Sequence, residues 1–339
     1  MQPVTWGLCA ALLLSVLGVG PNGTPDRELG DVMHAVRIHE FGGRDVLKYE
    51  EAPRPVPGKG EVLIKVHAAG VNPVDWKIRK GLFGPVQFPA TLGFDVSGVV
   101  EAVGEDVKRL VLGDEVYALL PLQKAGGYAE YVVCQESIVA LRPKRVDHET
   151  AAAVPLAALT AWQALLDHGK LEKGQTVLIH AGAGGVGHFA VQIAKAHGAR
   201  VIATASPENH EYLTTIGADQ VIDYKSQKFE ELVKDVDLVL DSIGGQTQSR
   251  SVGIIRKGGR LVSIVQPPSR EKLDEAGITG NIFLVQPDAD QLRRLAELID
   301  AGKIKPYISD TFPLADAAKA HEKSETARTV GKIVLTVPR

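Results

Sequence analysis

The sequence predicts an α/β protein in which a β-rich part is followed by a doubly wound parallel sheet. Two observations carry this prediction. Before Glu149, short alternating runs are separated by glycine turns, which favours a partly open barrel. After Glu149, apolar runs alternate with helical patterns, and such βαβ alternation implies a parallel sheet with helices on both faces. At 339 residues the chain is long enough for two domains.

The β-rich part is expected to contain several short strands and one short helix. Residues 60–66 alternate well enough for a strand. Glycines at 42–43, 104 and 113 supply the turns, and residues 71–81 read as a loop and a short helix. The expected strands are residues 34–38, 47–50, 60–66, 92–103, 115–120 and 129–133.

The second part begins with an alanine- and leucine-rich helical stretch, Ala151–Leu166. Helices at Ala289–Ala301 and Ala315–His321 and a last strand at Gly331–Val337 follow the sheet. We expect that last strand to return to the β-rich part, which would make this part discontinuous. The expected parallel strands are residues 177–180, 201–204, 220–223, 237–241, 260–265 and 281–286.

A glycine-rich turn follows the first parallel strand. Residues 182–187 read GAGGVG and fit G-x-G-x-x-G between a strand and a helix, the context in which this spacing binds a dinucleotide. Gly182 permits the tight turn, Gly184 lets the backbone approach a pyrophosphate, and Gly187 lets helix and strand pack closely. The pyrophosphate would lie at the helix N-terminus, where free N–H groups favour an anion. The expected contacts are Gly182, Ala183, Gly184, Gly185, Val186 and Gly187.

Composition excludes several classes of protein. The net charge of −3 gives no reason to expect binding to nucleic acid or to an anionic membrane. Only two cysteines occur, Cys9 and Cys134, so neither a cysteine zinc site nor a disulfide framework can form.

The chain resembles the medium-chain dehydrogenase/reductases, in particular their zinc-free quinone oxidoreductase (zeta-crystallin-like) branch. The resemblance spans nearly everything from Met33 to the C-terminus. It implies a GroES-like β-rich domain (33–155 plus 302–339) beside a Rossmann NADP-binding domain (156–301), with the active site in the cleft. The stretches that carry it are GEVLIKVHAAGVNPVDWKIRKG at 60–81, LGFDVSGVVEAVG at 92–104, GDEVYAL at 113–119, GGYAEYVV at 126–133, AAAVPLAALTAWQAL at 151–165, AGAGGVG at 181–187 and GADQVIDY at 217–224.

Residues 1–32 are expected to lie outside the fold. Residues 7–20 form an apolar run of signal-peptide length, but no Lys or Arg precedes it. One explanation is an export or anchoring segment; the other is a translation start assigned too early, with Met33 the functional first residue. We favour the second, because a nicotinamide enzyme needs a cytosolic pool of cofactor. A cytoplasmic protein without stable membrane association is therefore expected.

The residues at the family's zinc positions predict a metal-free reaction. In the zinc alcohol dehydrogenases a cysteine occupies the position of Asn72, and Gly-His-Glu occupies that of Gly93-Phe94-Asp95. A catalytic zinc needs about three protein ligands, so no metal is expected here. Without a Lewis acid the acceptor must already be electrophilic, as quinones and α,β-unsaturated carbonyl compounds are.

The end of the second parallel strand predicts NADPH rather than NADH. Ser206 occupies the position where a carboxylate would bind the ribose 2′-OH and repel a 2′-phosphate, and a serine hydroxyl can donate to phosphate instead. Glu208 opposes this choice, and the loop lacks an Arg or Lys unless His210 serves. Tyr224 and Lys225 are further expected contacts; the resemblance places the tyrosine there.

Further cofactor contacts are implied by the resemblance, and each has a structural alternative. Asn72 could form an Asx turn before Pro73, and Lys332 could be a solvated lysine. Ser242 follows strand 237–241 at a carboxyl edge, where ligands bind, although an ordinary βα turn would look the same. The positions that the resemblance implies are Asn72, Thr160, Val265, Phe283, Leu284, Val285 and Lys332, and the strand-end position adds Ser242, Ile243 and Gly244.

No general acid stands out in the sequence. Asp75 and Trp76 are candidates for the substrate pocket, although Trp76 could equally be a half-buried residue between domains. Tyr128 and water are candidate proton donors by location alone. Among the ten histidines no metal spacing occurs, and His180 reads as a core residue.

Together these patterns predict an NADPH-dependent reductase of quinones or of conjugated enones and enals. Two alternatives stay open: an enoyl-thioester reductase, and a non-catalytic NADPH-binding regulator. A homodimer is possible, because residues 281–285 would be an unpaired sheet edge in a monomer.

Overall fold

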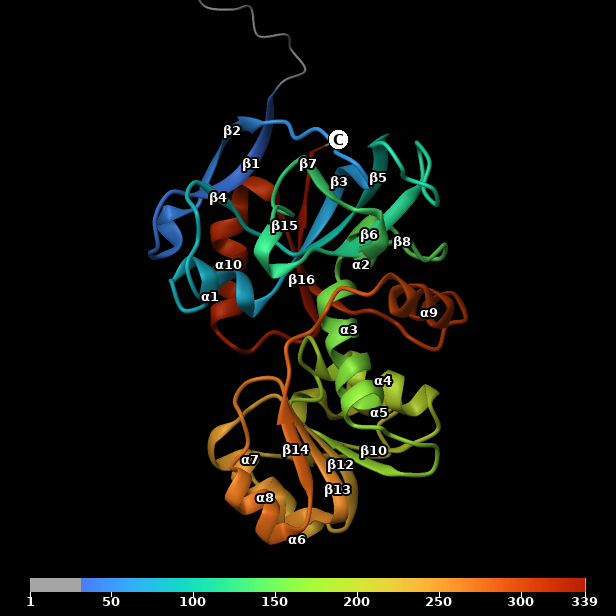
Figure 1. Cartoon of the computed structure of the whole chain (residues 1–339). Helices are drawn as coiled ribbons and strands as arrows, with labels where there is room; N and C mark the ends of the chain where they lie inside the picture. Colours follow the sequence, from blue (N-terminus) through green and yellow to red (C-terminus); the bar gives the residue numbers. More distant parts are fainter. Residues whose placement is uncertain (1–31, 339) are drawn as a thin grey trace, which may run out of the picture.

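The computed structural model describes residues 32–338. The prediction for residues 1–32 falls outside that part of the chain, except for Val32, where the first strand begins. Figure 1 shows a β-rich part and a part built on a parallel sheet, with helix α3 (Pro155–Trp162) lying between them. No helix within the described range is long and apolar enough to cross a membrane.

The β-rich part contains two sheets. In the larger sheet the strand order is β15-β16-β3-β5-β6-β8, and β7 also pairs with β3; a smaller sheet has the order β2-β1-β4. Strand β3 forms because its alternate residues Val62, Ile64 and Val66 are buried against the interior. The strands are β1 (Val32–Ile38), β2 (Lys48–Pro53), β3 (Glu61–Val71), β4 (Ala90–Thr91), β5 (Asp95–Val103), β6 (Glu115–Leu119), β7 (Tyr131–Gln135), β8 (Val139–Leu141), β15 (Ile308–Pro313) and β16 (Lys332–Thr336).

The C-terminal strand joins this larger sheet. Strand β16 runs antiparallel to β3, with Ile333 opposite Val71, and parallel to β15. The last strand therefore returns to the β-rich part, next to the segment that carries Asn72. The domain boundaries at 155/156 and 301/302 stay a prediction.

The other part is a six-stranded parallel sheet of order β11-β10-β9-β12-β13-β14. Val177, Leu178 and Ile179 of β9 are fully buried, as a central strand covered on both faces requires. From β9 the chain adds strands on one side of the sheet (β10, β11) and then on the other (β12, β13, β14). Ligands bind at the carboxyl ends of the strands at such a switch point, here β9 and β12. The strands are β9 (Thr176–Ile179), β10 (Arg200–Ala205), β11 (Gln220–Asp223), β12 (Val236–Asp241), β13 (Ile255–Ser263) and β14 (Thr279–Ile282).

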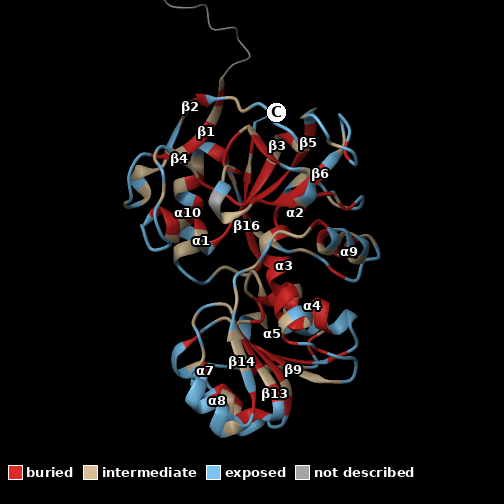
Figure 2. Ribbon diagram, viewed as in Figure 1, coloured by how far each residue is buried: buried red, intermediate tan, exposed pale blue. Residues whose placement is uncertain are grey.

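Helices connect the parallel strands and cover the sheet. Figure 2 shows buried residues concentrated in the sheets and along α3 and α4, whereas much of α7 and α8 is exposed. Helix α3 contacts α4 and α9 as well as strands β5 and β6, so it packs against both parts of the chain. The helices are α1 (Pro73–Arg79), α2 (His148–Ala152), α3, α4 (Gly187–Ala196), α5 (His210–Thr215), α6 (Phe229–Leu232), α7 (Gly245–Ser251), α8 (Arg270–Ala276), α9 (Ala289–Asp300) and α10 (Ala317–Glu325).

Several predicted elements differ in extent from the observed ones, and three of these differences have a clear physical reason. The single helix expected at 151–166 is divided, because Pro155 lacks an N–H and restricts the residue before it; a π-helical turn, Gln163–His168, follows α3. The strand expected at 92–103 begins only at Asp95, since Gly93 adopts a φ of 91°. The strand expected at 281–286 ends at Ile282, opposite the last residue of β13, so Phe283, Leu284 and Val285 lie beyond the sheet.

Candidate active site

The glycine turn lies at the carboxyl end of β9 and leads into α4. A Cβ on Gly187 would lie 2.1 Å from the carbonyl oxygen of Ala181, so only glycine allows the helix to start so close to the strand. A Cβ on Gly182 would lie 2.8 Å from the Cβ of Ala203 in β10. A Cβ on Gly184 would meet only the carbonyl oxygen of Ala181, at 3.3 Å, so the turn is less crowded here than at Gly182 or Gly187. These spacings match the three roles expected of the glycines, although nucleotide binding by residues 182–187 stays a prediction.

Asp241, which sequence reasoning missed, organises the loops at the ends of β12 and β13. Its Oδ1 accepts hydrogen bonds from the backbone N–H groups of Ile243 (3.0 Å) and Gly244 (2.8 Å). Its Oδ2 accepts from Gln248 Nε2 and from Ser263 Oγ, both at 2.9 Å. The signal in the sequence was a carboxylate at a strand end directly before a glycine turn. Asp241 therefore holds the Ser242–Gly244 loop, and acts on any ligand through that loop.

Apolar side chains are exposed at the same edge of the sheet. Ile243 is 54% exposed, Val265 41% and Leu284 49%, although residues of this kind are usually buried. The loop that carries Ile243 lies against the glycine turn, because Ser242 Oγ donates to the carbonyl oxygen of His180 at 2.8 Å. Phe283 is instead half-buried, with its ring 4.3 Å from that of His168. An apolar surface beside a dinucleotide turn is what a nicotinamide ring and a flat acceptor would cover.

The residues expected to recognise the 2′-phosphate lie around the end of β10. Ser206 Oγ accepts a hydrogen bond from Asn209 Nδ2 at 3.1 Å, and the Tyr224 side chain is largely exposed. Glu208 Oε1 lies 3.5 Å from Lys225 Nζ. Hydrogen bonds from the backbone of Glu208 itself and from Ser206 lower the pKa of Glu208, so this carboxylate is ionised. Near the expected 2′-phosphate position there is therefore one anion that opposes its binding, Glu208, and one cation that favours it, Lys225.

His210 and Thr160 present little to a ligand. His210 opens α5, and its Nε2 is buried without a hydrogen-bond partner among the described residues. The Thr160 hydroxyl donates to the carbonyl oxygen of Leu156 at 2.6 Å within α3. Both stay predicted cofactor contacts, but in this state the Thr160 donor is already used.

Lys332 is buried between the two parts of the chain, not solvated. Its side chain is 3% exposed, and its Nζ donates to the Val71 carbonyl oxygen at 3.1 Å and to Asn72 Oδ1. Asp95 Oδ2 lies 3.4 Å from the same ammonium group and accepts from Asn72 Nδ2 at 2.8 Å. The neighbouring Gly331 N–H donates to the Ala183 carbonyl oxygen at 2.8 Å, which ties this cluster to the glycine turn.

Asp95 is a second residue that sequence reasoning missed. Besides Lys332 and Asn72, the N–H of Leu156 at the start of α3 donates to its Oδ1 at 2.7 Å. Burial raises the pKa of Asp95, and the Lys332 ammonium opposes that rise. The only signal was an aspartate within the apolar run LGFDVSGVV. Asp95 thus fixes the orientation of the Asn72 amide, with its oxygen toward Lys332.

Asp75 contacts Asn72, and Tyr128 contacts Asp75. Both Asp75 and Tyr128 are fully buried, whereas Trp76 is half-buried. Asp75 Oδ2 accepts from the Asn72 N–H at 2.7 Å and from Tyr128 Oη at 2.8 Å. Burial raises the pKa of Asp75 to about 7. Trp76 Nε1 has no hydrogen-bond partner among the described residues, and Lys80 Nζ lies 5.0 Å from the centre of its ring.

Arg79 and His321, also missed in the sequence, extend this network toward α10. Arg79 Nη1 lies 3.1 Å from His321 Nδ1, and His321 Nε2 lies 3.3 Å from Tyr128 Oη. Arg79 Nη2 donates to Glu325 Oε1 at 2.7 Å. Burial and the Arg79 charge lower the pKa of His321 to about 3, so this imidazole is neutral. No local pattern could reveal these contacts, because Arg79 and His321 are 242 positions apart.

The residues at the positions of a family zinc site do not fit a metal. Asn72 offers an amide already bound to Lys332 and Asp95, and Phe94 offers a phenyl ring. Residues 32–338 contain no group of three or more His, Cys, Asp or Glu side chains that could hold a metal ion.

Comparisons with known proteins point to one family. Residues 58–144 match the model for the alcohol dehydrogenase GroES-like domain, and residues 216–335 match the model described as zinc-binding dehydrogenase. The NADPH-dependent alkenal/one oxidoreductase of Arabidopsis thaliana chloroplasts is 38% identical, over 93% of this chain and 82% of that protein.

Solved structures of quinone oxidoreductases are similar to this chain in fold. The quinone oxidoreductase from Coxiella burnetii has a TM-score of 0.84 and 36% identity, covering 91% of this chain and all of that one. The Escherichia coli quinone oxidoreductase complexed with NADPH has a TM-score of 0.82 and 30% identity, covering 89% of this chain and 99% of that one.

Replacing Lys332 with Met should lower the free energy of unfolding by about 3 kcal/mol, because the buried Asp95 would lose its cation. The matched control is Lys323→Met, which removes a half-exposed lysine near Asp310 and should change stability by less than about 1 kcal/mol. Urea unfolding of the three proteins measures both values. An equal decrease in the free energy of unfolding in the two variants would contradict a buried ion pair at Lys332.

Proposed function

Because the chain belongs to the quinone oxidoreductase branch of the medium-chain dehydrogenase/reductase superfamily, we propose that it transfers hydride from NADPH to a quinone or to an α,β-unsaturated carbonyl compound without a catalytic metal. The chain is an oxidoreductase that uses a nicotinamide cofactor. The observation that carries the finer proposal is the exposed apolar surface of Ile243, Val265 and Leu284 next to the glycine turn. The names of similar proteins, quinone oxidoreductase and alkenal/one oxidoreductase, support this substrate class.

The residues of this chain would bind and orient the cofactor and the acceptor rather than polarise the acceptor's carbonyl group. NADPH, when bound, supplies the hydride, and the turn at residues 182–187 would hold its pyrophosphate. Ile243, Val265 and Leu284 would exclude water and keep the two flat rings in contact. The amide of Asn72 is held rigidly by Lys332 and Asp95, so it would present one fixed face to the cleft. An acceptor that needs strong activation, such as a simple ketone, finds no Lewis acid at this position.

Turnover with a small panel of acceptors tests this function. NADPH oxidation should be fast with a benzoquinone or an alkenal, which are strongly electrophilic. It should be slower with a crotonyl thioester, whose conjugated carbonyl is a weaker hydride acceptor, and slow with a simple ketone, which needs activation. Preference for the thioester would favour the enoyl-thioester reductase instead. Tight NADPH binding with no turnover on any acceptor would favour the non-catalytic regulator.

Preference for NADPH over NADH should depend on Lys225. Replacing it with Gln should weaken NADPH binding about fivefold and leave NADH binding unchanged, because one exposed charged contact to the 2′-phosphate is lost. Glu208→Gln should have the opposite effect, since it removes the anion that Lys225 partly neutralises.

Lys228→Gln is the matched control, because Lys228 lies three residues further on and pairs with Glu231. Nucleotide titration followed by protein fluorescence gives the dissociation constants. Equal effects of Lys225→Gln on NADPH and NADH would rule out a role in recognising the 2′-phosphate.

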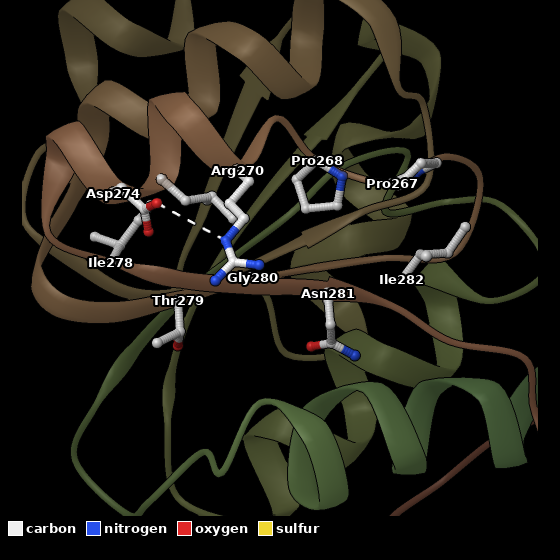
Figure 3. Close-up of a pocket in the computed structure, with 10 residues that line it drawn as sticks. Pro267, Pro268, Arg270, Asp274, Ile278, Thr279, Gly280, Asn281 and Ile282 are labelled. Carbon is white, nitrogen blue, oxygen red and sulfur yellow. Dashed lines mark ion pairs between the residues drawn. The ribbon is translucent and has the colours of Figure 1, made fainter.

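A homodimer through the edge of the parallel sheet is a further part of the proposal. Strand β14 ends the sheet, and its outer side has no partner strand among the described residues. A shallow hollow of about 360 Å³ lies along this edge (Figure 3), with Pro267, Pro268 and Ile282 among its lining residues. Ile282 is 43% exposed, and an open edge with exposed apolar residues is suited to pairing with a second copy.

Light scattering after size-exclusion chromatography should give twice the chain mass of 36.2 kDa. Ile282→Lys should shift the protein toward monomer, because it places a charge at the expected interface. Leu232→Lys, at a similarly exposed residue on α6, should leave the mass unchanged. A monomeric wild-type protein would reject the dimer.

We also propose a cytoplasmic location, supported by the need for a pool of reduced nucleotide. Relatives with organelle names exist, among them the chloroplastic alkenal/one oxidoreductase.

A further inference from the structure

Asp75 is a buried carboxyl group without a cation of its own. Asp95 is paired with Lys332, and Glu325 with Arg79 and Lys80. No lysine or arginine in residues 32–338 forms an ion pair with Asp75; the hydrogen bonds that it accepts come from the neutral Asn72 N–H and Tyr128 hydroxyl. Its Oδ1 is buried and has no hydrogen-bond partner in the same range. An ionised Asp75 would therefore leave a buried negative charge uncompensated.

The hydrogen bonds around Asp75 have a defined direction. Arg79 can only donate, so His321 Nδ1 accepts from it and the imidazole proton lies on Nε2. That N–H faces Tyr128 Oη, and the tyrosine proton is left to donate to Asp75 Oδ2. Oδ2 thus accepts two hydrogen bonds. A proton on Asp75 must therefore reside on Oδ1.

Charged groups from several elements face Asp75. Burial is the main reason that the pKa of Asp75 rises to about 7; Asp95 in β5 raises it further, and Lys332 in β16 lowers it. Arg79 in α1 and the neutral His321 in α10 lie beyond Tyr128. A change of one charge nearby would consequently change how much of Asp75 is protonated at neutral pH.

The glycine turn that we expect to hold the nucleotide adjoins this cluster. Asn72 bonds to Asp75 through its backbone and to Lys332 through its side chain. A Cβ on Gly185 of the glycine turn would lie 3.5 Å from Cδ of Lys332. The nicotinamide ring gains a positive charge when it is oxidised, and in a site of low dielectric constant such a charge stabilises a nearby carboxylate.

We propose that Asp75 is a proton site linked to the charge of the nicotinamide: it retains its proton beside the reduced nucleotide and releases it beside the oxidised one. This inference rests on the proposed function. In one turnover the acceptor gains a hydride from NADPH and a proton from water, while Asp75, beside the NADP⁺ that forms, releases its own proton to solvent. Solvent returns the proton to Asp75 after NADP⁺ dissociates, so atoms and charge balance.

The test compares proton release on binding NADP⁺ and NADPH, which carry the same phosphates and differ in the charge of the nicotinamide. Calorimetric titration at pH 7 in two buffers of different ionisation enthalpy gives the number of protons exchanged. NADP⁺ should release up to about half a proton more than NADPH, because Asp75 is about half protonated at this pH. Asp75→Asn should abolish the difference.

Tyr128→Phe provides a second variant should Asp75→Asn fail to fold. It removes a hydrogen-bond donor that lowers the pKa of Asp75. The pH at which proton release differs most between NADP⁺ and NADPH should therefore rise. Tyr117→Phe is the matched control: Tyr117 is also fully buried, but its hydroxyl donates to the Leu292 carbonyl oxygen at 2.5 Å. This control should leave the proton count unchanged.

The nucleotide-free protein supplies an independent readout. Asp75 binds a proton in the folded state up to about pH 7, whereas an unfolded aspartate has lost it above about pH 4. The contribution of Asp75 to stability is therefore present at low pH and disappears as the pH rises through 7. Asp75→Asn should remove this slope from the free energy of unfolding.

Two results would overturn the proposal while leaving the proposed function intact. One is tight binding and turnover with the same proton count for both nucleotides. The other is a difference that persists in Asp75→Asn. Failure of both nucleotides to bind would reject the proposed function itself, and the proton linkage with it.

Discussion

The ammonium group of Lys332 is the interaction on which the rest of the site depends. It is buried at the start of β16, where the β-rich sheet meets the glycine turn. It donates to the Val71 carbonyl and the Asn72 amide oxygen and pairs with the Asp95 carboxylate. A buried ion pair contributes little net stability, because desolvation offsets most of the attraction. What it supplies is a defined geometry: Asn72 can adopt one amide orientation, and Gly331 is held against the turn.

This arrangement supports the metal-free reaction that we propose, because the polar residues at the family's zinc positions are already bound by other groups of the chain. A zinc site requires anionic or imidazole ligands with free lone pairs. Here the amide oxygen of Asn72 is already bound by Lys332, and Asp95 accepts from three donors. The local charge is set by the chain itself. In the metal-free reaction that we propose, the acceptor's own electrophilicity would supply most of the reactivity.

Asp75 is the counterpart of this rigid cluster. The neighbouring carboxyl groups have cations, whereas Asp75 has neutral donors and one unpaired oxygen, and it depends on burial for its protonation. Along the series Arg79–His321–Tyr128, each residue donates its hydrogen bond to the next, and Tyr128 donates to Asp75. Such a group responds to changes of charge, whereas Lys332 and Asp95 resist them. The site therefore combines fixed geometry with a single adjustable charge.

The sequence by itself determined the fold class, the glycine turn and the family, because these depend on local signals: period-2 and period-3.6 patterns, and glycines at required spacings. It also predicts cofactor contacts at Asn72 and Lys332, by resemblance, and at Ser242, by its position at a strand end. It could not show that Lys332 is buried against Asp95, 237 positions away, or that Arg79 reaches His321. Contacts of this kind form only when β16 returns to β3 and α10 packs beside α1, and no local pattern specifies them. The protonation of Asp75 was likewise decided by tertiary structure alone, since burial and the distribution of cations among three carboxyl groups set its pKa.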